Sequence, residues 1–235
     1  MTALSSRAPL DNDDVEPLGL SLLELEEEET TDHIIGDLTI TLRGYPRSSG
    51  QTLQCTGETT WRGGDLLARH LYQCRAKTSA VVELGSGLGL VSLAARRLGI
   101  APVIVATDGD ERALEKLRRN CGSVATAGAI RDASAHLRAR FAEGTLSEQE
   151  FKDKKHELLN QHKTPVHVEQ LRWGDEYDVC RVLGRHSNNG FSLVLGADVA
   201  YTAAAVAPLA RTCRALLAPG GEVIIAYTRR HVDAN

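Results

Sequence analysis

The chain has 235 residues, a net charge of −4 at pH 7 and an estimated pI of 6.1. This length suits one large domain and argues against a second full one, and the acidic balance argues against nucleic acid as a partner. Its five cysteines are scattered without a Cys-x-x-Cys pair. We therefore expect reduced thiols in an intracellular compartment, and neither a zinc site nor a disulfide scaffold.

The N-terminal region contains no apolar core of the kind that a signal peptide requires. Residues 1–31 are polar and end in the acidic run Glu24 to Glu29, which predicts a disordered tail, with a docking segment for a basic partner as the alternative. The most apolar long window, 191–210, contains Asp198 and Pro208. It indicates a buried strand and a helix better than a membrane span, so we expect no membrane association.

The domain is expected to cover residues 32–235 and to open with a β-hairpin at 33–60. Apolar and polar residues alternate around Leu38, and again in 51–56, on either side of a turn cluster at 45–50. Trp61 follows, before a segment with helical periodicity at Leu66, Leu67, His70 and Leu71. Taken alone, such a tryptophan suits core packing.

A short apolar run, 81–84, leads directly into glycines at every second position. The run carries Glu83 and is followed by Gly85, Ser86, Gly87 and Gly89, and then by a segment with helical periodicity. This order predicts a buried strand, a tight turn and a helix whose free N–H groups face a ligand. A turn without any ligand is the alternative reading.

The spacing of these glycines differs from that of a dinucleotide-binding loop. The G-x-G-x-x-G fingerprint would need its third glycine at position 90, where the chain has leucine. Glu83 at the strand end would repel a pyrophosphate and favour a ligand with a cationic group. S-adenosylmethionine carries an ammonium and a sulfonium, so it fits this loop better than a nicotinamide cofactor does.

A second buried strand, 102–108, ends in Asp108. An acid about 20 residues after the glycine loop accepts hydrogen bonds from ribose hydroxyls in nucleotide-binding βαβ units. The alternative is an N-cap for the next helix, 111–120, but Asp110 is better placed for that role. Asp108 is therefore a candidate ribose ligand.

The second half of the chain alternates between strands and helices. Residues 131–164 are charged and helix-prone and predict an inserted surface helical hairpin, with a capping box at Ser147-x-x-Glu150. We expect strands at 165–175, 191–201 and 222–227, a polar loop at 181–189, a helix at 208–217 and a turn at 219–221. This alternation predicts an α/β fold with a mostly parallel sheet and ligands at the carboxyl ends of its strands.

The chain resembles methyltransferase family 16, a seven-β-strand family of class I protein-lysine methyltransferases with a Rossmann-like fold. The resemblance spans about residues 35 to 230. It rests on Trp61, Glu83-Leu-Gly-Ser-Gly-Leu-Gly89, Asp108, Leu117-x-x-Asn120, Leu171-Arg-Trp173-Gly174 and Asp198-x-x-Tyr201.

The resemblance implies S-adenosylmethionine as cofactor and a role for each matching residue. Trp61 closes over the cofactor, Gly85, Ser86 and Gly87 line its methionine half, and Asp108 holds the ribose. Trp173 packs by the adenine and Ala197 flanks the cofactor. Asp198 and Tyr201 face the substrate as the candidate catalytic pair. Without the resemblance, Asp198 could instead cap a helix that starts at 203.

The resemblance also implies a protein substrate methylated on lysine, a monomer, and a cytoplasmic, possibly also nuclear, location. The alternatives are a histidine, N-terminal amine or small-molecule acceptor, or a non-catalytic interaction protein. The family's sheet continues into a final antiparallel pair, whereas only five core strands are readable here. We therefore expect the last C-terminal strands to be lacking and the stability to be reduced.

Overall fold

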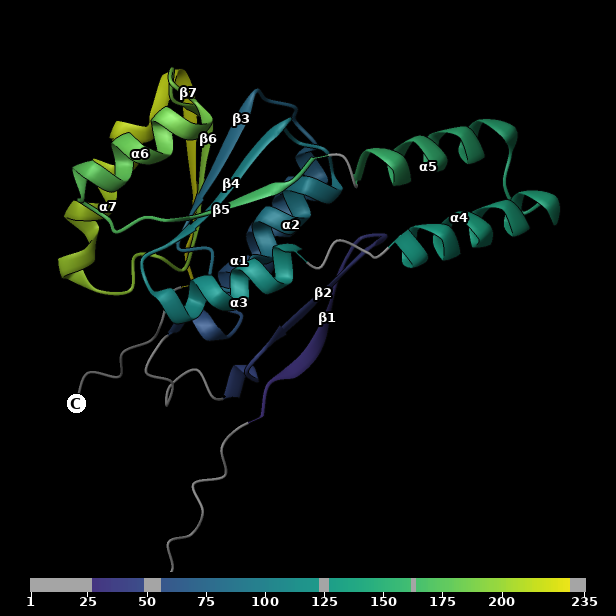
Figure 1. Ribbon diagram of the computed structural model, residues 1–235, viewed down its shortest axis with the longest axis horizontal. Coiled ribbons are helices and arrows are strands. Elements are labelled where there is room, and N and C mark those ends of the chain that lie inside the picture. Colours follow the sequence, from purple (N-terminus) through teal and green to yellow (C-terminus); the bar gives the residue numbers. More distant parts are fainter. Residues whose placement is uncertain (1–26, 49–55, 123–126, 162–163, 229–235) are drawn as a thin grey trace, which may run out of the picture.

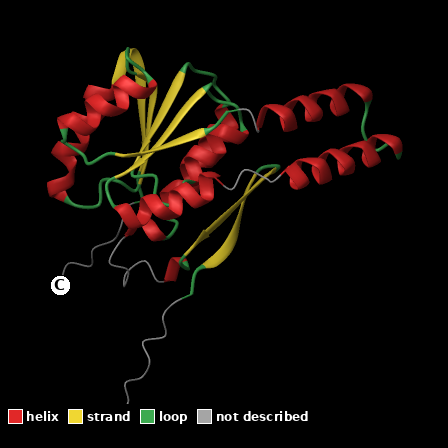
Figure 2. Cartoon of the chain, in the orientation of Figure 1, coloured by secondary structure: helices red, strands yellow, loops and turns green. Residues whose placement is uncertain are grey.

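The computed structural model describes residues 27–48, 56–122, 127–161 and 164–228. Its centre is a five-stranded sheet with the strand order β5-β4-β3-β6-β7, in which every neighbouring pair is parallel (Figures 1 and 2). The strands are β3 (Ala80–Leu84), β4 (Val103–Asp108), β5 (Val166–Gln170), β6 (Phe191–Ala197) and β7 (Leu217–Ala226). This confirms the predicted α/β fold with a mostly parallel sheet.

Helices cover both faces of the sheet, and the side chains of β3 alternate between them. Val82 packs in one apolar cluster with residues of α6 (Glu176–His186) and α7 (Ala203–Leu216). Val81 packs in another with residues of α1 (Arg62–Cys74) and α2 (Leu90–Arg97). Because both faces are covered, all five residues of β3 are buried, which explains why this strand reads as a continuous apolar run interrupted only by Glu83.

The strand order places a ligand site at one edge of the sheet. From β3 the chain moves to β4 and β5, with α3 (Glu111–Gly122) between them, and then crosses back to β6 on the other side of β3. The carboxyl ends of β3 and β6 therefore diverge into connections that leave in opposite directions. Such a switch point is where open parallel sheets bind ligands.

The N-terminal hairpin consists of β1 (Glu29–Ile35) and β2 (Leu38–Gly44), with Ile35 opposite Leu38. The prediction of a hairpin is confirmed, but the predicted turn at 45–50 was wrong. The chain turns at Gly36, whose φ of 63° suits a two-residue hairpin loop. The tail also ends earlier than expected, since β1 starts at Glu29. Residues 1–26 and 49–55, which include the end of the predicted turn cluster and most of the second alternating segment, lie outside the described part.

The insertion forms two helices, α4 (Ala127–Ala142) and α5 (Glu148–Gln161), which extend away from the sheet (Figure 1). Phe141 and Phe151 stack between them with ring centroids 4.6 Å apart. The predicted capping box is present: the Ser147 backbone N–H donates to Glu150 Oε2 at 2.8 Å, and the Glu150 N–H donates to Ser147 Oγ at 3.2 Å. Helical structure begins at 127, four residues before the predicted start at 131.

Two details of the predicted elements need correction. The region expected to be a polar loop, 181–189, is largely the C-terminal half of α6, where Val182 is buried in the apolar cluster of Val82. Asp175 caps the first turn of this helix. The predicted turn at 219–221 lies inside β7, as an irregularity in its pairing with β6. No helix within the described ranges is both long and apolar enough to cross a membrane.

Candidate functional site

A cavity of about 740 Å³ opens at the carboxyl edge of the sheet. The ends of β3, β4 and β6 contribute to its wall, together with the segments that follow β5 and β6 and the segment before α1. Every candidate residue from the sequence lines it: Trp61, Glu83, Gly85, Ser86, Gly87, Gly89, Asp108, Trp173, Ala197, Asp198 and Tyr201. The structure thus brings the whole predicted set into one site.

The glycine loop is shaped by close approaches that leave no room for side chains. Gly85 and Gly87 have φ values of 63° and 51°. A Cβ atom on Gly85 would lie 2.9 Å from Val199 Cγ1, and one on Gly87 would lie 3.1 Å from the Gly57 carbonyl oxygen. Any larger residue would therefore both strain the backbone and clash with these neighbours.

Glu83 points its carboxyl group at the start of α2. Glu83 Oε2 accepts a hydrogen bond from the Ser92 backbone N–H at 2.9 Å and another from Ser92 Oγ. Burial raises the pKa of Glu83 to about 7, against the opposing effect of these hydrogen bonds. Glu83 therefore joins β3 to the first turn of α2. The sequence predicts a role in attracting a cationic ligand but does not predict this contact.

The raised pKa of Glu83 makes a prediction for stability. Its pKa in the folded chain is about 7 instead of 4.5, so its contribution is fully present below pH 4.5 and is lost as pH rises through 7. We expect the free energy of unfolding to fall by roughly 2 kcal/mol between pH 5 and pH 8, and Glu83→Gln to remove most of that decline. Urea titrations at the two pH values test this; parallel pH dependence in both proteins would contradict it.

Asp108 lies at the end of β4 with its carboxylate directed to the glycine loop. Its Oδ2 accepts from the Gly87 N–H and its Oδ1 from the Asp110 N–H, both at 3.1 Å. Burial raises the pKa of Asp108, although these backbone hydrogen bonds oppose it. Asp110, not Asp108, accepts from the Arg112 N–H at 2.8 Å in the first turn of α3, which confirms that Asp110 caps this helix.

The segment 56–61, of which only Trp61 was singled out from the sequence, closes one side of the cavity. It includes a short 3-10 helix (Thr56–Glu58), and Trp61 Nε1 donates to the Thr56 carbonyl oxygen at 2.8 Å. The buried Glu58 pairs with Lys116 Nζ of α3 at 3.4 Å. One helical turn later, Asn120 Nδ2 donates to the carbonyl oxygen of Leu88 at 3.0 Å, so α3 also holds the glycine loop.

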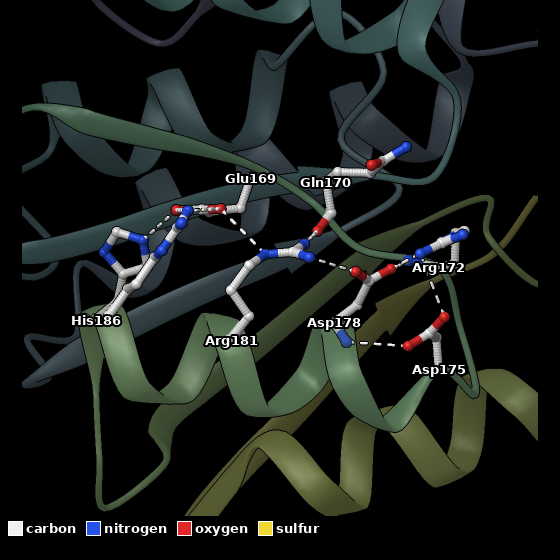
Figure 3. Close-up of polar contacts among 8 residues, drawn as sticks. Glu169, Gln170, Arg172, Asp175, Asp178, Arg181 and His186 are labelled. Atoms are coloured by element: carbon white, nitrogen blue, oxygen red, sulfur yellow. Dashed lines mark hydrogen bonds and ion pairs between the residues drawn. The ribbon is translucent and has the colours of Figure 1, made fainter.

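Trp173 lies on the loop after β5, and a network of charges fixes that loop (Figure 3). The fully buried Asp178 accepts hydrogen bonds from the backbone N–H of Arg172 at 3.1 Å and from its Nε at 2.9 Å. Arg181 Nη1 lies 2.5 Å from the other oxygen. Burial alone would raise the pKa of Asp178, but these hydrogen bonds outweigh it and lower the pKa to about 2.

Asp198 has a left-handed backbone, with φ of 54°, immediately after β6. Its carboxylate accepts from the Gly63 N–H at the start of α1 and from the Thr228 N–H, both at 2.7 Å, and from Thr228 Oγ1 at 3.2 Å. The alternative role as cap of the helix at 203 is wrong, because Thr202 Oγ1 accepts from the Ala205 N–H there. Asp198 instead caps α1 by accepting the hydrogen bond from the Gly63 N–H. Because the two residues are 135 positions apart, no spacing in the sequence predicts this contact.

Tyr201 lies at the open side of the cavity. Its side chain is 53% exposed, and its ring centroid is 6.4 Å from that of Trp173. The aromatic rings of two separate loops thus lie near each other in the cavity lining.

Comparison with known proteins finds matches among protein methyltransferases. The family model described as lysine methyltransferase matches residues 145–235. "Protein N-terminal and lysine N-methyltransferase EFM7" of Yarrowia lipolytica is 23% identical over 73% of this chain and 56% of its own length. "Protein-lysine N-methyltransferase EFM3" of Chaetomium thermophilum is 30% identical over 75% of this chain and 44% of its own. The chain therefore spans about half the length of the curated relatives it matches.

Among solved structures, the rRNA methyltransferase aviRa from Streptomyces viridochromogenes aligns over 77% of this chain and 82% of its own, with 16% identity and a TM-score of 0.49. The family match and the two curated relatives coincide with the resemblance read from the motifs. Residues 145–235 of this chain thus match the lysine methyltransferase family, which the motifs also resemble.

Proposed function

We propose that this chain is an S-adenosylmethionine-dependent methyltransferase that modifies a lysine side chain of a protein. The observation that carries the proposal is the convergence of the glycine loop, the acid at the end of β4 and the aromatic residues after β5 and β6 on one cavity. The cavity lies at the switch point of the parallel sheet, and the curated relatives carry this activity in their names.

The residues present fit the cofactor. The glycine loop lines the cavity, and its backbone packs so closely on Val199 and Gly57 that Gly85 and Gly87 leave no room for a side chain. Asp108 is a half-buried carboxylate at the proposed ribose position, and Trp173 offers an apolar wall for an adenine. When bound, the cofactor supplies a sulfonium methyl group. The residues of the chain position this methyl group and exclude water from it, and these two effects matter most for an in-line displacement.

The acceptor side is proposed at Asp198 and Tyr201. A carboxylate has about four lone-pair sites, and the hydrogen bonds from Gly63 and Thr228 occupy three of those of Asp198. One site remains to orient an incoming ammonium. A free lysine has a pKa of about 10.4, and the amine must lose its proton before it attacks. Desolvation in the cavity favours the neutral amine, while Tyr201 shapes the channel.

An N-terminal amine is the second candidate acceptor. The name of the Yarrowia lipolytica relative includes N-terminal as well as lysine methylation. Both acceptors are primary amines, and both would enter the cavity at the end of a flexible chain. We further propose that the enzyme acts as a monomer on a protein partner in the cytoplasm, with the nucleus as a second location.

Calorimetric titration with S-adenosylmethionine and, separately, with NAD tests the cofactor. Micromolar binding of the first alone supports the proposal, and binding of NAD alone would refute it. Methylation of peptide arrays then tests the acceptor. Peptides with a lysine-to-arginine change should lose the signal, and peptides with an acetylated N-terminus should keep it; the reverse result would identify the N-terminal amine.

A further inference from the structure

Arg172 brings a positive charge next to the proposed ribose site. The Leu171 backbone N–H donates to the Asp108 carbonyl oxygen at 2.8 Å, so the two strand ends lie side by side. Arg172 Cγ is 3.6 Å from the position that a Cβ atom on Gly109 would take. Arg172 also lines the cavity together with Asp108 and Asp110. Arg172 therefore lies on the strand end next to Asp108, the one acid of β4.

Two other acids hold this guanidinium. Arg172 Nε donates to Asp178 Oδ2 at 2.9 Å, and its Nη2 lies 3.3 Å from Asp175 Oδ2. Figure 3 shows both acids on the α6 side of Arg172. Asp175 Oδ1 accepts from the Asp178 N–H at 3.0 Å as the N-cap of α6. The cap of one helix and a buried acid in its first turn thus form a clamp on Arg172.

The clamp is anchored from behind. Arg181 Nη1 lies 2.5 Å from Asp178 Oδ1, and its Nη2 donates to the Gln170 carbonyl oxygen. Arg181 Nε also lies 3.8 Å from Glu169 Oε2. Asp178 therefore cannot rotate toward the cavity without breaking a buried ion pair, which would leave an uncompensated charge.

We propose that Asp175 and Asp178 hold the Arg172 guanidinium away from Asp108 and so keep the Asp108 carboxylate available for the ribose of the cofactor. Carboxylates and guanidinium groups form bidentate pairs, which would occupy the same lone pairs that ribose hydroxyls need. The clamp thus gives the Arg172 guanidinium its own acidic partners, so that the carboxylate of Asp108 remains free to accept hydrogen bonds from the ribose. This inference rests on the proposed function, since it requires Asp108 to bind the cofactor.

Asp175→Asn is the sharpest test, because asparagine is as good an N-cap as aspartate but carries no charge. We expect it to weaken S-adenosylmethionine binding about threefold, and Asp178→Asn to weaken it about tenfold, as Arg172 turns toward Asp108. Adding Arg172→Gln to either variant should restore the affinity to that of the Arg172→Gln single variant. Calorimetry on all five variants and the wild type measures this coupling.

The rescue separates the proposal from a purely structural role. If the acids only stabilise the loop, the loss of affinity will persist after Arg172→Gln, and the proposal is overturned. Unchanged affinity in Asp175→Asn and Asp178→Asn would also overturn it. If Asp178→Asn does not fold, the comparison of Asp175→Asn with the double variant Asp175→Asn/Arg172→Gln still tests the proposal. Failure of the wild type to bind S-adenosylmethionine would instead refute the proposed function itself.

Discussion

Asp108→Asn is expected to weaken the binding of S-adenosylmethionine about 100-fold, which corresponds to roughly 2.7 kcal/mol. Asparagine keeps one oxygen for the N–H of Gly87 or Asp110, so the glycine loop should retain its shape. It lacks the charge and the second acceptor that a pair of ribose hydroxyls would use. Charge-assisted hydrogen bonds contribute about 1.5–3 kcal/mol each, so the loss should be large.

Asp110→Asn is the matched control for this measurement. The two acids are two residues apart, and asparagine can still cap α3 through the N–H of Arg112. We expect the control to bind within about threefold of the wild type, since it loses a charge near the site but no ribose ligand. Equal losses in the two variants would show that general charge, and not a ribose contact of Asp108, governs the affinity.

The fold was predictable because its strongest sequence signals are local. Residues 81–84 and 191–197 are apolar runs that require burial on both faces, and glycines or acids mark where such strands end. The hairpin turn at Gly36 was missed because 45–50 contains a denser group of turn residues. Helix α6 was missed because its single apolar face is narrow, and charged residues that pair with the sheet edge dominate its sequence.

The candidate site was predictable as a set of residues but not as a set of contacts. Motif positions at strand ends meet at one edge because the sheet is parallel, which is a consequence of topology. The partners of those residues depend on distances between remote segments. Asp198 binds Gly63, 135 positions away, and Lys116 binds Glu58. No periodicity or spacing encodes such pairs, so the second layer of the site could be seen only in the structure.

Gly63→Ala is expected to cost about 2–3 kcal/mol of stability, even though alanine normally favours a helix over glycine. A Cβ atom at this position would lie 2.6 Å from Asp198 Oδ2 and 2.7 Å from its Cγ. The carboxylate would have to leave the N-terminus of α1 and with it the 2.7 Å hydrogen bond from the Gly63 N–H. Trp61 immediately precedes α1, so cofactor affinity should fall as well.

Gly63→Ala should cost less stability in a protein that lacks the Asp198 carboxylate. Asp198→Ala alone should cost about 2–3 kcal/mol, because it removes a charged group from a helix N-terminus and places alanine at a positive φ. In that background Gly63→Ala should cost less than about 1 kcal/mol, since only the backbone nitrogen at 198, 3.0 Å from the new Cβ, still crowds it. Urea unfolding of the four proteins measures the difference. An equal cost of Gly63→Ala in both backgrounds would mean that the Asp198 side chain does not determine the need for glycine, and that α1 is held in place by its apolar face alone.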